Sequence, residues 1–163
     1  MSMIGNYRRL TEAELNALLE EPGTITEILY SEEGQDDTDK QLDVDKAWHA
    51  IHYLLNGTAW DGKEPLVNAV LGGLPVGEED VGYGPARYLR PTQVAETSKA
   101  LQAISSEQLW SRFNAAAMKK AEIYPEFERW EEDKEYICGY FENIKSFFVV
   151  AASRGDAMLL YLN

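Results

Sequence analysis

The stretch LDVDKAWHAIHYLLNG, residues 42–57, does most to decide the fold. Three of its apolar residues recur at the 3.6-residue spacing of a helix that buries one face: Trp48, Ile51 and Leu55. Asp43 or Asp45 is the predicted N-cap, because a carboxylate can accept hydrogen bonds from the free amides of a first helical turn. Gly57 is a natural end for the same helix. We therefore expect a short helix that packs on the core through Trp48.

Helices are also predicted on both sides of this stretch. Thr11 and Glu14 form a capping box, and Pro22-Gly23 ends the helix that it starts. The remaining helices are expected over a short segment from Thr24, from Pro65 to Leu71, from Pro91 to Ala103, from Ser105 or Ser106 to about Ala117, and from about Glu131 to Ser153. The acidic segment Ser31–Gln41 and the glycine-rich segment Leu74–Pro85 are predicted loops.

Strands are predicted at Ser2–Leu10, Ala86–Leu89 and Ala157–Leu162. The last of these is almost entirely apolar, and such a strand is usually covered on both faces of its sheet. Three or four short strands among six or seven helices indicate an α/β fold with a small central sheet between helices. At 163 residues, the chain is expected to form a single domain over residues 1–163.

The composition argues against several classes of partner. With 28 acidic and 15 basic residues the net charge is −13, which would repel nucleic acid and an anionic membrane surface. No apolar run reaches the ~18 residues that a membrane span needs. The acidity indicates either a solvated surface or one that steers a basic partner protein. Cys138 has no second cysteine to pair with, and the N-terminus lacks the layout of a signal peptide, so we expect a cytoplasmic protein.

Short motifs run in order through the whole chain: Met3-Ile4-Gly5, Leu42-Asp43-x-Asp45-Lys46-x-Trp48, His52, Gly57, Ala69-Val70-Leu71-Gly72, Gly82-Tyr83-Gly84-Pro85-Ala86-Arg87-Tyr88-Leu89 and Ile123-Tyr124-Pro125. Together they resemble the YfbM-like family of uncharacterised bacterial proteins. The resemblance implies a three-layer α/β/α sandwich, in agreement with the pattern of elements. It implies an architecture and no activity.

The two histidines of the chain, His49 and His52, lie three residues apart and can share one side of the predicted helix. With Asp43 and Asp45 just upstream, a metal site is one interpretation, although zinc would need a further ligand from elsewhere in the chain. The alternative is a hydrogen-bonded core histidine, because His52 lies on the apolar stripe of the helix. We expect no metal and no cofactor.

The segment GYGPARY, residues 82–88, is the better candidate for binding. Its glycines let backbone amides approach a ligand, and Arg87 can hold a carboxylate or phosphate through two hydrogen bonds. Tyr83 and Tyr88 can stack on a ring. Alternatively, the glycines only shape a turn and Arg87 pairs with an acid. The predicted ligand site is one cleft that joins these three side chains to Trp48 and His52, for a small anionic or aromatic ligand.

Two kinds of function remain open. One is a non-catalytic module that binds a ligand in this cleft, or a basic protein on an acidic face. The other is a small hydrolase or transferase in which His52 is the acid/base and Arg87 clamps an anion. The enzyme requires His52 and Arg87 in one solvent-reachable pocket, whereas the binding module predicts that His52 is sealed inside the fold. Cys138 lies among apolar neighbours and is not expected to be a nucleophile.

Overall fold

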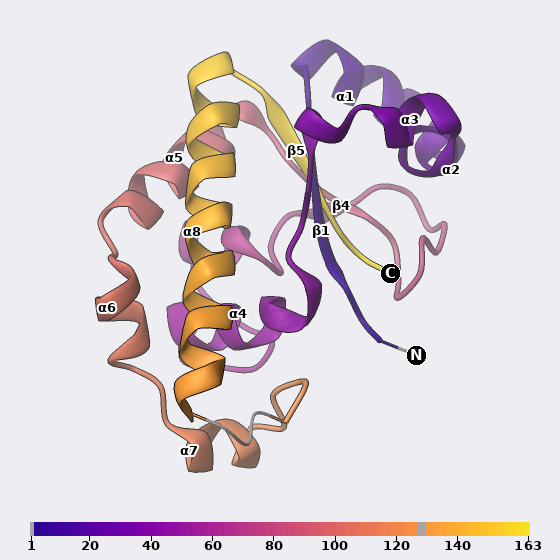
Figure 1. The fold of residues 1–163 in the computed structure, drawn as a ribbon. Helices are drawn as coiled ribbons and strands as arrows, with labels where there is room; N and C mark the ends of the chain where they lie inside the picture. Colours follow the sequence, from indigo (N-terminus) through magenta and orange to yellow (C-terminus); the bar gives the residue numbers. More distant parts are fainter. Residues whose placement is uncertain (1, 127–129) are drawn as a thin grey trace.

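A five-stranded antiparallel sheet lies at the centre of the part of the chain that the computed structural model describes, residues 2–126 and 130–163 (Figure 1). The strands lie in the order β2 (Gln41–Asp43), β1 (Gly5–Leu10), β5 (Ala157–Leu162), β4 (Arg87–Leu89) and β3 (Leu74–Pro75). The two longest strands, β1 and β5, come from opposite ends of the chain and pair from Gly5 with Leu162 to Leu10 with Ala157.

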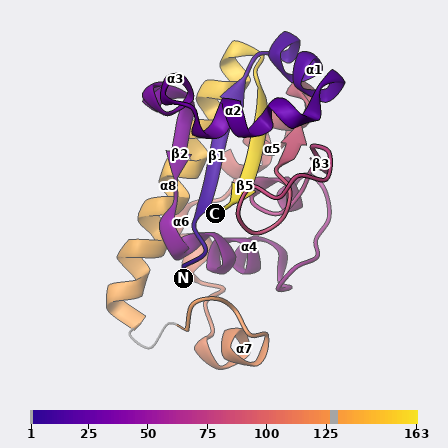
Figure 2. The same cartoon turned by 90° about the vertical axis from the view of Figure 1, so that its right-hand side faces the viewer.

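Helices cover both faces of this sheet. Alternate residues of β5 enter two separate hydrophobic clusters, because successive side chains of a strand point to opposite faces. Met158 and Leu160 join the larger cluster, which includes residues of α4, α5 and α8, whereas Leu159 and Tyr161 join a smaller one under α1 and α2. Figures 1 and 2 show the same two layers of helices with the sheet between them. The α/β fold and the predicted cover on both faces of β5 are confirmed.

Eight α-helices occur in the described residues, against the six or seven predicted: α1 (Glu12–Glu20), α2 (Ile25–Tyr30), α3 (Glu32–Asp36), α4 (Trp48–Asn56), α5 (Pro91–Gln102), α6 (Ser106–Trp110), α7 (Ala115–Lys120) and α8 (Trp130–Arg154). The capping box of Thr11 and Glu14 is present. The helix predicted from Ser105 to Ala117 is two helices, because Asn114 caps α7 by accepting a hydrogen bond from the Ala117 amide at 3.0 Å. The helix predicted at Pro65–Leu71 is a single 3₁₀ turn, Leu66–Ala69.

The two predicted loops are more ordered than expected. Segment Ser31–Gln41 contains α3, which Ser31 caps, and leads into β2; segment Leu74–Pro85 begins with β3. Two arginines of β1 anchor the acidic segment: Arg8 donates to the Gly34 carbonyl at 2.8 Å, and Arg9 pairs with Asp39 at 3.4 Å. β2 and β3, with three and two residues, are too short to show an alternating pattern, and the sequence did not predict either of them.

Helix α4 forms as predicted but does not begin as predicted. Its N-cap residue is Ala47, with no side-chain hydrogen bond, and a 3₁₀ turn over Asp45–Ala47 leads into it. The two predicted cap residues form other hydrogen bonds. Asp43 accepts from the Asp45 amide at 2.7 Å, and Asp45 accepts from the Tyr136 hydroxyl at 2.7 Å. Gly57 ends the helix with a φ of 75°, as expected for a left-handed C-terminal residue.

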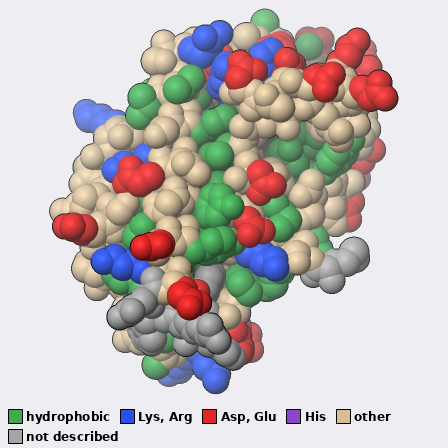
Figure 3. Space-filling model, viewed as in Figure 1, with side chains coloured by type: hydrophobic (Ala, Val, Ile, Leu, Met, Phe, Trp, Pro, Cys, Tyr) green, Lys and Arg blue, Asp and Glu red, His purple; other side chains and the backbone are tan. Residues whose placement is uncertain are grey.

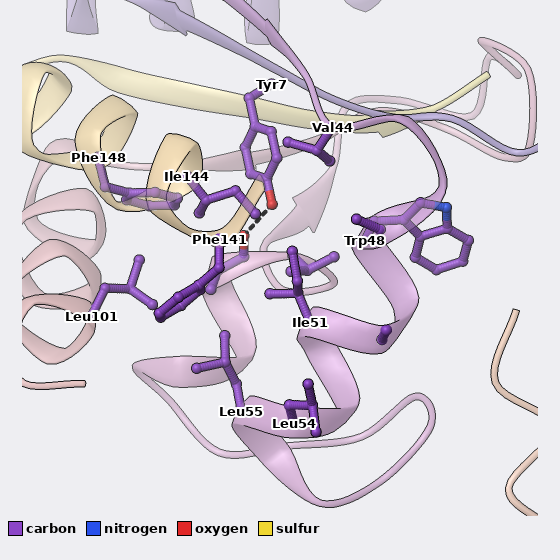
Figure 4. Close-up of a cluster of buried hydrophobic side chains, with 14 of the residues drawn as sticks. Tyr7, Val44, Trp48, Ile51, Leu54, Leu55, Leu101, Phe141, Ile144 and Phe148 are labelled. Carbon is purple, nitrogen blue, oxygen red and sulfur yellow. Dashed lines mark hydrogen bonds between the residues drawn. The ribbon is translucent and has the colours of Figure 1, made fainter. Parts of the chain in front are cut away.

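The main core lies between α4, α8 and the sheet (Figure 4). Trp48 is 0% exposed, as predicted, and its indole Nε1 donates to the Met3 carbonyl at 3.0 Å. Tyr7 of β1 enters the same core and donates its hydroxyl to the Ala69 carbonyl at 2.5 Å. No helix in the described residues is both long and apolar enough to cross a membrane.

Candidate functional site

His52 is sealed inside the fold, at 0% exposure. Its Nε2 donates to the Asp61 carbonyl at 3.0 Å, and its Nδ1 accepts from the Asn56 side-chain amide at 3.4 Å. The pKa of His52 is lowered to about 4, mainly by burial; the hydrogen bond to the Asp61 carbonyl opposes the shift, and the neighbouring His49 and Arg87 contribute to it. The imidazole is therefore neutral at pH 7, with one nitrogen as donor and the other as acceptor.

His49 is equally buried and bonds two separate parts of the chain. Its Nε2 donates to the Ala59 carbonyl at 2.8 Å, and its Nδ1 accepts from the Tyr124 amide at 2.9 Å. The ring stacks on Trp48, with centroids 4.8 Å apart and planes 12° apart, and burial lowers the pKa of His49. Both ring nitrogens of each histidine are in use, and no group of three or more potential metal-ligating side chains occurs in the described residues.

Arg87 lies near His52 but is held by the main chain. One of its terminal nitrogens donates to the Val70 and Gly72 carbonyls, both at 3.0 Å. The residue follows the alternation of β4, so Arg87 lies on the same side of the sheet as Leu89, which belongs to the main core. The guanidinium thus fixes the turn at Val70–Gly72, and this hydrogen bonding competes with the predicted grip on an anion.

The five residues of the predicted cleft do not come together. Tyr88 faces the opposite side of the sheet, where it packs on the smaller cluster with the Arg90 guanidinium 5.6 Å from its ring centroid. Tyr83 is 40% exposed in the loop between β3 and β4. Its amide donates to the Leu162 carbonyl, at the end of β5, at 3.0 Å. Neither of the two hollows described below is lined by any of the five. Their role in ligand binding stays a prediction, but the structure does not bring the five residues together in a single cleft.

The glycines of residues 82–88 are accounted for by the turn itself. Asp80 accepts hydrogen bonds from the amides of Gly82 at 2.8 Å and Gly84 at 3.0 Å. A Cβ atom at Gly82 would lie 2.5 Å from the Cα of Asn163, so the end of β5 requires glycine there. These amides were predicted to approach a ligand, but an internal carboxylate occupies them.

One hollow of the described surface lies between α7 and the segment after it. Its volume is about 700 Å³. We call it the α7 groove; it is lined by Phe113, Ala115, Ala116, Met118, Lys119, Glu122, Ile123, Tyr124, Pro125 and Glu126. A second hollow, of about 510 Å³, follows residues Leu55–Leu66 and is more open. The α7 groove is mainly apolar, with three charged side chains.

Helix α4 fixes one wall of the α7 groove. The Tyr124 amide donates to His49, and the Tyr124 hydroxyl accepts from the Met3 amide at 3.1 Å. The ring of Tyr124 lies 6.1 Å from that of Trp48. The wall is therefore anchored at both its backbone and its side chain, and the groove is preformed on this side.

The same histidine supports an exposed tryptophan. Trp60 is 60% exposed, and its ring lies 4.5 Å from that of His49. The loop that carries it, residues 57–62, is held by the two histidines through the Ala59 and Asp61 carbonyls. Thr58 adds a hydrogen bond from its hydroxyl to the Asp61 carbonyl at 2.6 Å. The buried histidines thus position Trp60 beside the wall of the α7 groove.

The acidic surface predicted from the sequence lies elsewhere. Asp and Glu side chains gather over α2 and α3 in Figure 3, at the opposite end of the molecule from α7 in Figures 1 and 2. Part of this charge is neutralised within the chain, since Asp37 pairs with Arg8 at 3.5 Å and with Lys40 at 3.6 Å. The pair with Arg8 attaches the end of α3 to β1.

The α7 groove was missed by the sequence reasoning. Phe113 was assigned to the interior of one long helix, and Ile123-Tyr124-Pro125 was interpreted only as an extended segment. The signal that could have pointed to it is the pair Phe113-Asn114, an apolar residue followed by a good N-cap, which indicates a break in the helix.

Comparison with known proteins agrees with this architecture. A family model described as a domain of unknown function, DUF1877, matches residues 1–161. The chain belongs to this family. The DUF1877 chain is also 31% identical over 133 residues to Protein YfbM of Escherichia coli strain K12, covering 77% of this chain and 74% of that protein. The chain is also similar to the crystal structure of YfbM from Escherichia coli, described as a protein of unknown function. The two superpose with a TM-score of 0.74 at 24% sequence identity, covering 98% of this chain and 99% of the other. The resemblance to the YfbM-like family is confirmed by the family model and the sequence comparison. The structural comparison supports the fold alone.

Proposed function

We propose that the chain is a non-catalytic binding module that holds a segment of a partner protein in the α7 groove. The observation that carries the proposal is a preformed, mainly apolar hollow of about 700 Å³, one wall of which is anchored to α4. Binding pockets commonly measure about 300–1,000 Å³ and combine apolar walls with a few polar groups. A groove of this size accepts two or three side chains of a peptide.

The groups required by the alternative enzyme argue for the same conclusion. A general acid/base works best with a pKa near the working pH and within reach of its substrate. His52 is fully buried with a pKa of about 4, and Arg87 donates to two main-chain carbonyls. Neither side chain lines the α7 groove. Both residues therefore support the fold around the groove in this proposal.

Trp60 and Tyr124 give this surface the aromatic content of a binding hot spot. Interface hot spots are enriched in tryptophan, tyrosine and arginine that are held in place before binding. Trp60 is exposed but supported by His49, and Tyr124 is half-buried with both its backbone and its hydroxyl bonded. A partner would therefore meet aromatic side chains that lose little conformational freedom on binding.

Peptide selection with a blocked groove tests the proposal. A random peptide library is selected against the immobilised protein, and the Kd of each selected peptide is measured by fluorescence anisotropy. Ala116 lines the groove, so Ala116→Trp should fill it and weaken the selected peptides at least tenfold, which corresponds to about 1.4 kcal/mol. Ala95 of α5 is also exposed, and Ala95→Trp is the matched control with unchanged Kd. Selected peptides that bind Ala116→Trp as tightly as the parent would contradict a groove site.

We further propose a cytoplasmic location for this module. The single cysteine, Cys138, is half-buried within α8, and burial raises the pKa of its thiol. Such a thiol is poorly reactive and suits a reducing compartment. Fractionation of cells that express the tagged protein at its natural level would test the location.

A further inference from the structure

A glutamate at the edge of the α7 groove has an unusual backbone. Glu122 has a φ of 59°, in the left-handed region that favours glycine. It follows the last turn of α7, where the Ile123 amide donates to the Met118 carbonyl at 3.1 Å. This is the hydrogen-bond arrangement of a helix end at which glycine is the usual residue. The chain therefore keeps a charged side chain where glycine would be conformationally easier.

The Glu122 side chain is exposed and lines the groove together with Glu126. Lys119 supplies the one positive charge among the residues that line the groove, so this lining carries a net charge of −1. No ion pair of Glu122 or Glu126 occurs among the described residues. Both carboxylates are thus available to a group that enters the groove.

We propose that the occupant is a peptide segment with an arginine or lysine beside an apolar anchor, and that Glu122 receives the cationic side chain. This inference rests on the proposed function and specifies its partner. The apolar wall formed by Met118 and Pro125 takes the anchor, and the two carboxylates complement the positive charge.

The same geometry disfavours the small anionic ligand predicted from the sequence. An anion in the α7 groove would meet two unpaired carboxylates against a single Lys119. Arg87, which was the predicted anion clamp, does not line the groove. Like charges at a binding site reduce affinity and exclude unsuitable partners. The groove therefore selects for a cationic segment.

Two synthetic peptides test the charge preference. One fluorescein-labelled peptide carries a leucine-phenylalanine-leucine core followed by two arginines, and the other carries two glutamines in place of the arginines. We expect the arginine peptide to bind about fivefold more tightly, because exposed ion pairs make only a modest contribution to affinity. Raising the salt from 50 to 300 mM should remove most of that difference.

Variants assign the preference to Glu122. Glu122→Gln should reduce the affinity for the arginine peptide about threefold and leave the glutamine peptide unchanged. Glu96→Gln removes one exposed charge from α5 and should affect neither peptide. Equal affinity for both peptides, or an unchanged preference in Glu122→Gln, would overturn the inference while the proposed function stands. If neither peptide binds, or if both still bind Ala116→Trp, the proposed function itself fails.

Discussion

His49 accepts the backbone amide of Tyr124 on its Nδ1 at 2.9 Å, so a side chain of α4 sets the position of the groove wall 75 residues away in sequence. The other ring nitrogen holds the Ala59 carbonyl at 2.8 Å. This one imidazole therefore links the loop that carries Trp60 to the α7 groove. The arrangement explains why a buried polar residue lies at this point of the core, because both of its partners would otherwise be unsatisfied.

Replacing His49 should loosen the groove wall. His49→Ala leaves the Tyr124 amide and the Ala59 carbonyl without their partner, and each unsatisfied buried group costs about 1–3 kcal/mol. We expect the free energy of unfolding to fall by about 3 kcal/mol in urea titrations, and the Tyr124 amide to exchange its hydrogen at least tenfold faster. The Leu109 amide, which bonds to the Ser105 carbonyl, is the internal control. Full protection of the Tyr124 amide in the variant would contradict this account.

The buried histidines predict a loss of stability in mild acid. The pKa of His52 is about 4 in the folded chain and about 6.5 when exposed, so the unfolded chain binds more protons between these values. Stability should be complete above pH 6.5 and fall as the pH drops toward 4. Since one pKa unit corresponds to 1.36 kcal/mol, we expect about 2 kcal/mol less at pH 5 than at pH 7 from His52 alone. Equilibrium unfolding at the two pH values measures the difference.

His52→Gln provides the control for this pH dependence. Glutamine retains a side-chain amide that can donate to the Asp61 carbonyl but does not titrate. The variant should be less stable than the parent at pH 7 and should lose less stability between pH 7 and pH 5. If the parent chain is as stable at pH 5 as at pH 7, then the conclusion that His52 is buried in its neutral form is wrong.

Two tryptophans should respond in opposite ways to truncation. Trp48 is 0% exposed and its replacement by alanine should cost about 3–5 kcal/mol, whereas Trp60 is 60% exposed and Trp60→Ala should cost less than about 1 kcal/mol. We expect Trp60→Ala instead to weaken groove-binding peptides by about tenfold. Thermal melts and anisotropy titrations of both variants separate the two effects. A large loss of melting temperature in Trp60→Ala would show that the ring serves the core.

Glycine at position 122 should stabilise the fold. Because Glu122 has a φ of 59°, Glu122→Gly relieves a left-handed conformation and should raise the free energy of unfolding by about 0.5–1 kcal/mol. Glu96 lies within α5, so Glu96→Gly should destabilise the chain by about 1 kcal/mol. Urea unfolding of the pair therefore gives opposite signs. A destabilised Glu122→Gly would mean that the glutamate side chain supports the fold.

Local patterns predicted the long elements and did not predict the contacts between them. The Trp48–Leu55 stripe, the Thr11 capping box and the apolar β5 strand each give a strong signal over several residues, and all three are present. Strands β2 and β3 have three and two residues, so only their pairing with β1 and β4 defines them. Asp43 and Asp45 were predicted to be helix caps from their residue type. Instead, Asp43 accepts from the first amide of a 3₁₀ turn, and Asp45 accepts from the Tyr136 hydroxyl.

The candidate site was predictable in its parts and not in its location. The buried state of His52 follows from its place on an apolar stripe, and one of the two alternatives considered for it is the one observed. The split of Tyr88 from Arg87 follows from strand alternation, yet their assignment to one cleft ignored it. The α7 groove depends on the hydrogen bond between His49 and Tyr124. No local sequence pattern predicts a contact between residues so distant in sequence.

The pairing of β1 with β5 has a consequence for biosynthesis. The longest pair of strands unites residues 5–10 with residues 157–162, so the nascent chain cannot complete its sheet until the second set has left the ribosome. Until then β1 exposes unpaired backbone groups and an apolar surface that favours aggregation. Pairing of such distant segments is also slow, because a long loop must close first. The sheet can therefore form only after residues 157–162 have been made, and the growing polypeptide is a natural client for chaperones that shield unpaired strands.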